Sequence, residues 1–523
     1  MIQNQSLKTL WLFIACCCMG IVALAQTIRG VVVNDNEEPL PGVTIQLGSS
    51  QVFSTTDNRG AFTIAAKTGD TLWVSYVGYE DMFHIVKTSN VRLQMSEKSD
   101  NTLSDVVVIG YGTQKKVNLS GSVSVIGKDK LENRPVNNAV QALQGLSPGL
   151  VVTRSSGQPG AEGWNINIRG YSSLNGTNKP LLIVDGVEYA NLTLINPSDI
   201  ESMTVLKDAS AAAIYGAKAS NGVLLITTKA GKAGKVMVSY TGMYQIKKPI
   251  SLPQTVPFHI SAALQNLANI NNGGSPSFTD KQIAMFKDPS VTLVPDDPAN
   301  LFYYQEMDYV GMTVNKQFSS WQHNLDITGG NDKTRYFIGL GYNNNNGMFK
   351  VGPDDNQRYN LRVNLTTKFN RILSLDSRMS FIQNTINQAA GTLTGDYGLL
   401  YNVYNLRPIY PVFVPGSNET KYASISGNNT YASLKDGGYN ESKQNVLDGV
   451  FTLKAENLAK GLVLSTNYSP HIEQKNQDLF YKTVPLYNFV KSSGDFAQNA
   501  WLNRANSLRK YRTSQNWYTF NAL

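Results

Sequence analysis

The sequence predicts a mainly β protein in three successive parts: a small β-sandwich, an α+β domain, and the first part of a transmembrane antiparallel β-barrel. Short β-type runs separated by turn residues occupy residues 27–95. Strand and helix patterns mix between residues 115 and 232, and long alternating segments follow from about residue 235. A chain of 523 residues is long enough for several such units.

The N-terminus is typical of an export signal. Lys8 precedes an apolar stretch over residues 10–24, and Ala23-Leu24-Ala25 is a small-residue cleavage pattern. We expect a signal peptide over residues 1–25 and a lipid-free mature chain that begins at Gln26. The alternative is a lipoprotein signal at Phe13-Ile14-Ala15-Cys16, which would leave a lipidated Cys16 at the mature end.

The cysteines limit the chemistry. Cys16, Cys17 and Cys18 all lie in the expected signal segment. Cleavage after Ala25 would leave no cysteine, which excludes disulfides, cysteine metal sites and thiol nucleophiles. The net charge of +8 could suggest a nucleic-acid partner, but the basic residues are dispersed and the export signal argues against one.

Residues 26–97 predict the β-sandwich. Five β-type runs, at residues 28–33, 43–47, 61–64, 72–79 and 91–95, are separated by turn sequences such as Asp57-Asn58-Arg59-Gly60. Residues 98–114 then form a linker that contains Asp105-Val106-Val107-Val108-Ile109-Gly110. An extended apolar strand there could offer its backbone to a partner protein, or it could be a core strand of the next domain.

Residues 115–232 predict the α+β domain. Two strands, at residues 181–184 and 187–189, flank Asp185-Gly186, which is a type I′ hairpin signal. A strand at residues 199–206, a short helix at 209–213 and a strand at 223–228 follow.

From residue 233 onward the alternation predicts membrane-spanning strands of roughly 9 to 12 residues each. The alternation is seen at residues 334–343, 359–369, 373–381, 451–456 and 462–468. One face of residues 359–369 is apolar, while the other carries Asn360, Arg362, Asn364, Thr366 and Lys368. Charges such as Arg362 and Lys368 suit a wet lumen. Short turns such as residues 329–332 alternate with long stretches at about 250–318 and 386–445, as periplasmic turns alternate with external loops in outer-membrane barrels.

No catalytic or metal-binding motif is present. His84, His259, His323 and His471 are widely separated, and neither a His-Glu-x-x-His nor a Gly-x-Ser-x-Gly pattern occurs. We therefore expect no enzyme activity, no metal and no cofactor.

The segment from Val184 to Lys229 resembles the plug signature of the SusC/RagA family of TonB-linked outer-membrane proteins. The resemblance rests on Val184-Asp185-Gly186-Val187, on the unbroken run from Ile200 to Gly216, and on the run from Ala219 to Lys229. The signature residues are Asp185, Gly186, Lys207, Asp208, Ala209, Tyr215, Gly216, Asn221 and Gly222. Residues 26–97 resemble the family's carboxypeptidase-regulatory-like domain, and Asp105, Val106, Val107, Val108, Ile109 and Gly110 resemble its TonB box.

The resemblance implies a plug over residues 115–232 and the N-terminal part of an outer-membrane barrel over residues 233–523. It implies active import of an oligosaccharide, or of a peptide, with TonB and a SusD-like surface lipoprotein as partners and the barrel in contact with outer-membrane lipid. The N-terminal domain and the TonB box would be periplasmic. The residues that bind substrate are not readable from the sequence.

Two alternatives remain open. A siderophore or cobalamin receptor would share barrel and plug, and a surface adhesin would use the N-terminal domain alone. A plugged nutrient barrel has about 22 strands, whereas about eight to ten segments can be counted here, and Phe520-Asn521-Ala522-Leu523 is no obvious strand. We therefore expect a truncated chain, because an open barrel would leave two bare edges in lipid.

Overall fold

The fold was described from a computed structural model. It describes residues 27–522 except 36, 49–51, 97–105, 110–111, 116–122, 133, 174–177, 253, 292–305, 391–398, 416, 425–427, 459–461, 491–492 and 494. The expected signal peptide, Asp105 and Gly110 lie outside the described residues. The chain divides into two compact units, and the boundary between them along the sequence falls within the linker. One unit is N-terminal, and the other contains all residues from Leu119 onward.

The N-terminal unit is a sandwich of two sheets around one apolar core. One sheet has the order β4-β1-β7, from β1 (Thr27–Val33), β4 (Ala61–Ala65) and β7 (Asn90–Gln94). The other has the order β3-β2-β5-β6, from β2 (Thr44–Leu47), β3 (Phe53–Thr55), β5 (Thr71–Ser75) and β6 (Met82–Ile85). Ile28 of the first sheet and Ile45 of the second share the core. The five predicted strands are present, while β3 and β6, which are short, were missed.

The plug is built on a five-stranded sheet with the order β10-β15-β16-β13-β14. Its strands are β10 (Val123–Gly127), β13 (Leu181–Val184), β14 (Val187–Glu188), β15 (Ile200–Leu206) and β16 (Val223–Thr228). A separate hairpin of β11 (Leu150–Arg154) and β12 (Trp164–Ile168) shares the apolar core with it. The short helices are α2 (Lys128–Glu132), α3 (Ala139–Ala142), η2 (Pro197–Asp199), α4 (Ala209–Ala212) and η3 (Ala213–Ala219).

The predicted type I′ turn between β13 and β14 is confirmed. Asp185 has a φ of 50° and Gly186 a φ of 87°, and this turn needs positive φ at both central positions. Asp199, predicted as the first residue of a strand, instead ends η2, with Asn196 capping that short helix.

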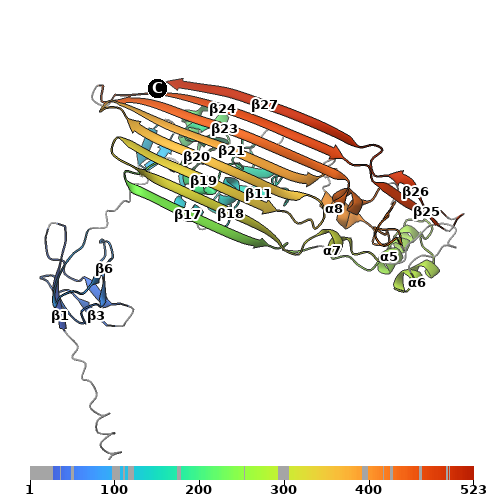
Figure 1. The fold of residues 1–523 in the computed structure, drawn as a ribbon, viewed down its shortest axis with the longest axis horizontal. Helices are drawn as coiled ribbons and strands as arrows, with labels where there is room; N and C mark the ends of the chain where they lie inside the picture. Colours follow the sequence, from blue (N-terminus) through green and yellow to red (C-terminus); the bar gives the residue numbers. More distant parts are fainter. Residues whose placement is uncertain are drawn as a thin grey trace, which may run out of the picture. The chain divides into compact units, whose positions relative to one another are not determined.

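Eight long antiparallel strands form one sheet, in the order β17-β18-β19-β20-β21-β23-β24-β27 (Figure 1). Their bounds are β17 (Gly234–Lys247), β18 (Phe318–Gly330), β19 (Thr334–Asn346), β20 (Asp354–Lys368), β21 (Leu373–Ala389), β23 (Gly438–Glu456), β24 (Val463–Tyr481) and β27 (Ser507–Ala522). The strands have 13 to 19 residues, longer than the alternation suggested. The polar residues at the strand ends also pair with the neighbouring strand. The hydrogen-bonded sheet therefore extends beyond the segments whose residues alternate between apolar and polar.

The two faces of this sheet differ as the alternation predicted. On β20, Tyr359 and Leu361 are exposed on one face, whereas Arg362, 5% exposed, is buried on the other. The plug packs against this second, polar face (Figure 1). By the alternation, Lys368 belongs to the same face of β20 as Arg362. It is nevertheless exposed, because it is the last residue of the strand.

The connections alternate in length along the sheet. Residues 331–333, 369–372 and 457–462 are short turns at one end. At the other end lie residues 347–353 and three long connections, residues 248–317, 390–437 and 482–506. Figure 1 shows the elements of the long connections gathered beyond that end. They are α5 (Phe258–Asn271), α6 (Asp280–Lys287), α7 (Tyr309–Thr313), α8 (Leu399–Asn405), β22 (Tyr422–Ala423), α9 (Thr430–Lys435), β25 (Pro485–Val490) and β26 (Asp495–Trp501).

Three expectations about this sheet were wrong. Residues 386–389 and 438–445 were assigned to a loop, but they complete β21 and begin β23, where Gln388 pairs with Asn440. The last residues were not expected to form a strand, yet β27 pairs with β24 from Tyr481 to Thr466. These segments show no regular alternation of apolar and polar residues, so their pairing depends on the neighbouring strand. Among the described residues, no helix is long and apolar enough to cross a membrane.

Candidate functional site: the contact between plug and sheet

A cluster of buried charges joins the plug to the inner face of the sheet. Asp185 of the plug turn pairs with Arg378 of β21, and Nη1 of Arg362 lies 4.0 Å from the Asp185 carboxylate. Nε of Arg362, on β20, is 3.2 Å from Oδ2 of Asp199. The side chains of Asp185, Asp199 and Arg362 are all almost fully buried. Two plug acids are thus balanced by two arginines of the sheet.

The plug strand β16 contributes to the same cluster. The amide and hydroxyl of Thr228 donate to the Asp185 carboxylate at 3.0 and 2.7 Å. The ammonium of Lys229 is 3.0 Å from Oδ2 of Asp326 on β18. Asn364 of β20 donates to the carbonyl of Lys229 at 2.6 Å. The turn at Asp185 and the end of β16 are therefore fixed together against β18, β20 and β21.

Further along β20, contacts are made to plug carbonyl groups. Arg358 donates to the carbonyl oxygens of Thr193 and Asn137 at 2.7 and 2.6 Å. Asn360 donates to the carbonyl of Leu194 at 3.1 Å. Because backbone acceptors occur at every residue, these donors place the plug without demanding particular plug side chains.

One amide pair links η2 of the plug to β18. Nδ2 of Asn196 donates to Oδ1 of Asn324 at 2.8 Å, and both residues are buried. Burial raises the pKa of the nearby Asp199 carboxyl, and the positive charge of Arg362 opposes that shift. The contact is polar throughout these positions, so water can replace its hydrogen bonds if the plug moves away.

The structure places the predicted signature residues in different roles. Asp185 contacts the sheet, and Gly186 completes its turn. Asp208 precedes α4 and pairs with Arg169, and Asn221 accepts a hydrogen bond from Ser172 at 2.6 Å. Lys207 directly follows β15, Ala209 begins α4, and Tyr215 and Gly216 lie in η3. Of these residues, the contacts given above tie Asp185 to the sheet, while Asp208 and Asn221 pair within the plug.

Sequence reasoning missed most residues of the contact. Asp199, Thr228, Arg358 and Asn196 were not singled out, whereas Arg362 was placed on a polar face without a partner. The sequence signal that points to the contact is this polar face of β20, which has to face water or charged groups. Among the described residues, no group of three or more His, Cys, Asp or Glu side chains converges in a way that could hold a metal ion.

Gly222 is required by both its conformation and its surroundings. Its φ is 87°, and an added Cβ would lie 2.8 Å from Cδ1 of Ile168 and 2.9 Å from the carbonyl oxygen of Leu206. We expect Gly222→Ala to destabilise the plug by about 2 kcal/mol, because both the backbone and the packing are strained. Faster hydrogen exchange in β16 would measure the loss. Gly186→Asn is the control, because nothing lies near a Cβ there and Asn tolerates positive φ; equal exchange in the two variants would contradict the prediction.

The predicted TonB box is only partly described. Val106, Val107, Val108 and Ile109 form β8 (Val106–Ile109), which pairs with β9 (Gly112–Lys115) in a two-stranded sheet. This small sheet is separate from the five-stranded sheet of the plug. The segment is therefore not a strand of that five-stranded sheet.

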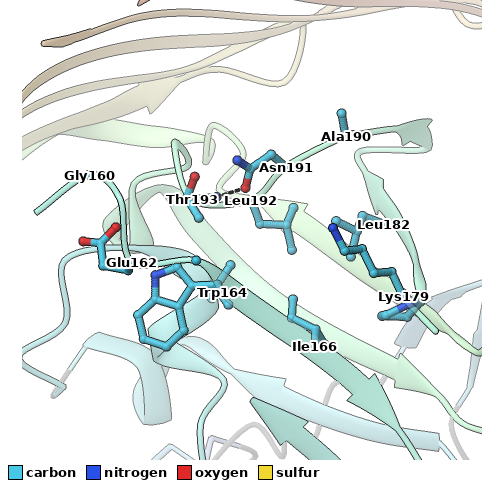
Figure 2. Close-up of a pocket in the computed structure, with 13 residues that line it drawn as sticks. Gly160, Glu162, Trp164, Ile166, Lys179, Leu182, Ala190, Asn191, Leu192 and Thr193 are labelled. Carbon is cyan, nitrogen blue, oxygen red and sulfur yellow. Dashed lines mark hydrogen bonds between the residues drawn. The ribbon is translucent and has the colours of Figure 1, made fainter. Parts of the chain in front are cut away.

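The plug also contains a cavity of about 300 Å³. Figure 2 shows Trp164 and Glu162 at one side of it and Lys179 at the other, with Leu192 between them. Oδ1 of Asn191 accepts a hydrogen bond from the amide of Thr193 at 2.9 Å, which fixes the loop that forms one wall. This cavity could not be predicted from the sequence, because its lining comes from four separate segments.

An internal domain held against the polar face of a membrane-type sheet defines a plugged barrel. Family models agree: residues 115–223 match the TonB-dependent Receptor Plug Domain, and residues 28–109 match the CarboxypepD_reg-like domain. TonB-dependent receptor P26 of Formosa agariphila is 32% identical over 462 residues, which cover 87% of this chain and 44% of that protein. TonB-dependent receptor SusC of Bacteroides thetaiotaomicron is 33% identical over 440 residues, covering 81% and 40%.

Among solved structures, the RagAB peptide importer in its open-open state matches with a TM-score of 0.62 and 25% identity, covering 80% of this chain and 46% of that one. The chain belongs to the SusC/RagA type of TonB-dependent receptors. Receptors of this type are outer-membrane β-barrel proteins, so the sheet wall described above lies in the outer membrane. The chain spans less than half the length of these relatives.

Proposed function

We propose that the whole protein imports a bulky nutrient, an oligosaccharide or a peptide, across the outer membrane with energy delivered by TonB. The observation that supports this most is the polar contact between plug and sheet, in which buried ion pairs and hydrogen bonds hold the plug. A permanent structural domain would be expected to bury an apolar interface. A polar contact of this kind suits a plug domain that has to move out of the lumen during transport.

The segment from Asp105 to Gly110 is proposed as the site where TonB pairs as an added strand. Within the part of the chain that the structure describes, β8 pairs with β9 alone, and an extended strand with one partner can accept a second strand at its other edge. Residues 26–97 are proposed as a periplasmic domain, residues 98–114 as the linker, residues 115–232 as the plug and residues 233–523 as part of the barrel. The short turns would then face the periplasm and the long connections the outside.

A SusD-like surface lipoprotein is proposed as the partner on the outer side. The relatives named SusC and RagAB support this, and the long connections offer the surface. A siderophore or cobalamin receptor is the alternative function, favoured by iron-repressed expression. A surface adhesin is the second, favoured by recovery of the native protein outside the outer membrane.

Deletion of residues 105–110 in the whole protein, expressed in its own host, tests the coupling. We expect uptake of a fluorophore-tagged oligosaccharide mixture, or of a tagged peptide digest, to fall to background, because TonB no longer has a strand to pair with. Surface binding of the same probes should be unchanged. Deletion of residues 98–103, which has the same length, is the control and should leave uptake intact. Normal uptake by the first variant would overturn the assignment.

A further inference from the structure

One sheet of the N-terminal domain carries a row of large side chains on its solvent face. In the sheet β3-β2-β5-β6, the residues on either side of Trp73 are buried in the core, so Trp73 lies on the opposite face of β5. The pairing register places Gln46 of β2 opposite both Trp73 and Phe53 of β3. It also places Phe83 of β6 opposite Trp73. The row therefore crosses all four strands, and three of its four members are aromatic.

The two ends of this row are open to solvent. Phe53 is 70% exposed and Phe83 is 74% exposed, and Ile85, on the same face of β6, is 56% exposed. Apolar surface in contact with water costs free energy, and contiguous patches of it on a domain mark binding surfaces. The other face of the sheet already supplies the core of the domain. The exposed rings are therefore available for a ligand.

A row of hydroxyl groups runs beside the rings. Thr44 of β2 lies opposite Thr55 of β3 and Ser75 of β5. Each of these residues is two positions from a member of the first row, so it shares the same face at a distance of about 7 Å along the strand. Hydroxyl groups both donate and accept hydrogen bonds. We call the two rows together the aromatic face.

The strands of the aromatic face carry no charge. β2, β3, β5 and β6 contain no Asp, Glu, Lys or Arg. Asp81 and Lys87, beyond the two ends of β6, have opposite signs, so the face favours neither a polyanion nor a polycation. The solvent face of the other sheet differs, because Arg29 of β1 and Arg92 of β7 are exposed there. An uncharged ligand is the one that complements the aromatic face.

The size of the aromatic face argues against a second copy of this chain. Adjacent strands are about 4.8 Å apart, so four strands of at most five residues offer roughly 250 Å². Each partner of a stable dimer buries about 800 Å². A narrow ligand matches this surface better than a folded protein does.

An oligosaccharide has the matching chemistry. The C–H groups on one side of a sugar ring pack against the negative face of an aromatic ring, while its hydroxyl groups point outward from the ring edge. Phe53 and Trp73 are two strands apart, which corresponds to about 10 Å, close to the length of two extended sugar units. The rings and the adjoining hydroxyl row can thus bind successive units of one chain.

We propose that the aromatic face binds an uncharged oligosaccharide, with sugar rings stacked on Phe53, Trp73 and Phe83 and sugar hydroxyls bonded to Thr44 and Ser75. The proposal rests on the import function above, which delivers substrate to the periplasm where residues 26–97 are placed, and it selects the oligosaccharide from the two substrate classes. An imported chain would be held by this domain after it leaves the lumen. Peptides have charged termini and cell-wall glycan carries acidic peptide stems, so neither matches the uncharged face.

The test is hydroxyl-radical footprinting of the purified whole protein, because oxidation reports ligand contact at individual side chains. The probes are neutral glucan and mannan hydrolysates, solubilised cell-wall glycan, and a tryptic peptide digest. We expect at least one neutral hydrolysate to protect Phe53, Trp73 and Phe83 from most of their oxidation. Val31, which is exposed on the other sheet, should be oxidised as before.

Matched variants measure the contribution of the rings and of the hydroxyl row. Phe83→Ala should weaken binding of the protecting sugar at the aromatic face about tenfold, because it removes one stacked ring. Thr44→Val keeps the shape but removes a hydrogen-bonding group, so binding should weaken about threefold. Val31→Ala is the control and should bind normally. Low oxidation of Ile28, which is fully buried, shows that each variant domain is folded.

Three results would overturn the proposal: no protection by any neutral hydrolysate, unchanged affinity in Phe83→Ala, or stronger protection by cell-wall glycan or peptides. The import function is tested separately by the deletion of residues 105–110. If that deletion abolishes uptake while the rings stay unprotected, only the sugar-binding face fails. If uptake persists and sugar protects the rings, the face stands and the coupling assignment fails.

Discussion

Replacing Asp185 by alanine is expected to loosen the plug by about 3 to 5 kcal/mol, because it leaves two buried arginines without their shared acid. Arg378 loses its plug partner, Arg362 keeps only Asp199, and Thr228 loses two hydrogen bonds. Hydrogen exchange of β13 and β16 amides in the assembled protein measures the change. We expect exchange to accelerate roughly a hundredfold or more, since about 1.4 kcal/mol corresponds to tenfold.

Two further variants separate the effect of the buried charge from that of an ordinary surface ion pair. Asp185→Asn keeps a residue that tolerates the positive φ of the turn but removes the charge, so its effect should be intermediate. Glu188→Gln removes the exposed ion pair with Lys218 and should change stability by less than about 1 kcal/mol. Exchange in Asp185→Ala at the rate of the unaltered protein would show that the buried cluster does not hold the plug.

Tying the plug to the sheet is expected to stop uptake almost completely. The amides of Asn196 and Asn324 touch, one on η2 of the plug and the other on β18. A variant with cysteine at both positions, in a background without other cysteines, can be bridged by a short bis-methanethiosulfonate reagent. The bridge would keep this part of the plug against the wall while the TonB segment is pulled, so the lumen would stay closed.

Uptake of the tagged probes would be measured before bridging, after it, and after release by a reductant. We expect uptake in the first and third conditions and background in the second. Each single-cysteine variant, treated with the same reagent, controls for modification alone. Normal uptake by the bridged protein would mean that substrate passes without movement of η2.

The sequence predicted local features well where one residue pattern determines the structure. Asp185-Gly186 identified its turn, and the alternation of Tyr359, Leu361 and Arg362 identified which face of β20 would be buried. Prediction failed for β27, because Lys510 and Arg512 share a face with Tyr518 and Phe520, so no regular alternation marks the strand that pairs with β24. It also missed Asp199, because its ion pair with Arg362 joins segments far apart in the chain.

The central claim is that residues 115–232 sit on the polar inner face of the membrane strands, held by the contacts of Asp185, Asp199 and Asn196. The most direct measurement is bridging of the Asn196→Cys, Asn324→Cys variant in intact outer membranes, read as a mobility shift that reductant reverses. The account predicts rapid bridging in the resting protein and none between Asn196→Cys and a cysteine at Tyr359, on the outer face of β20. Equal bridging of both pairs, or of neither, would contradict it.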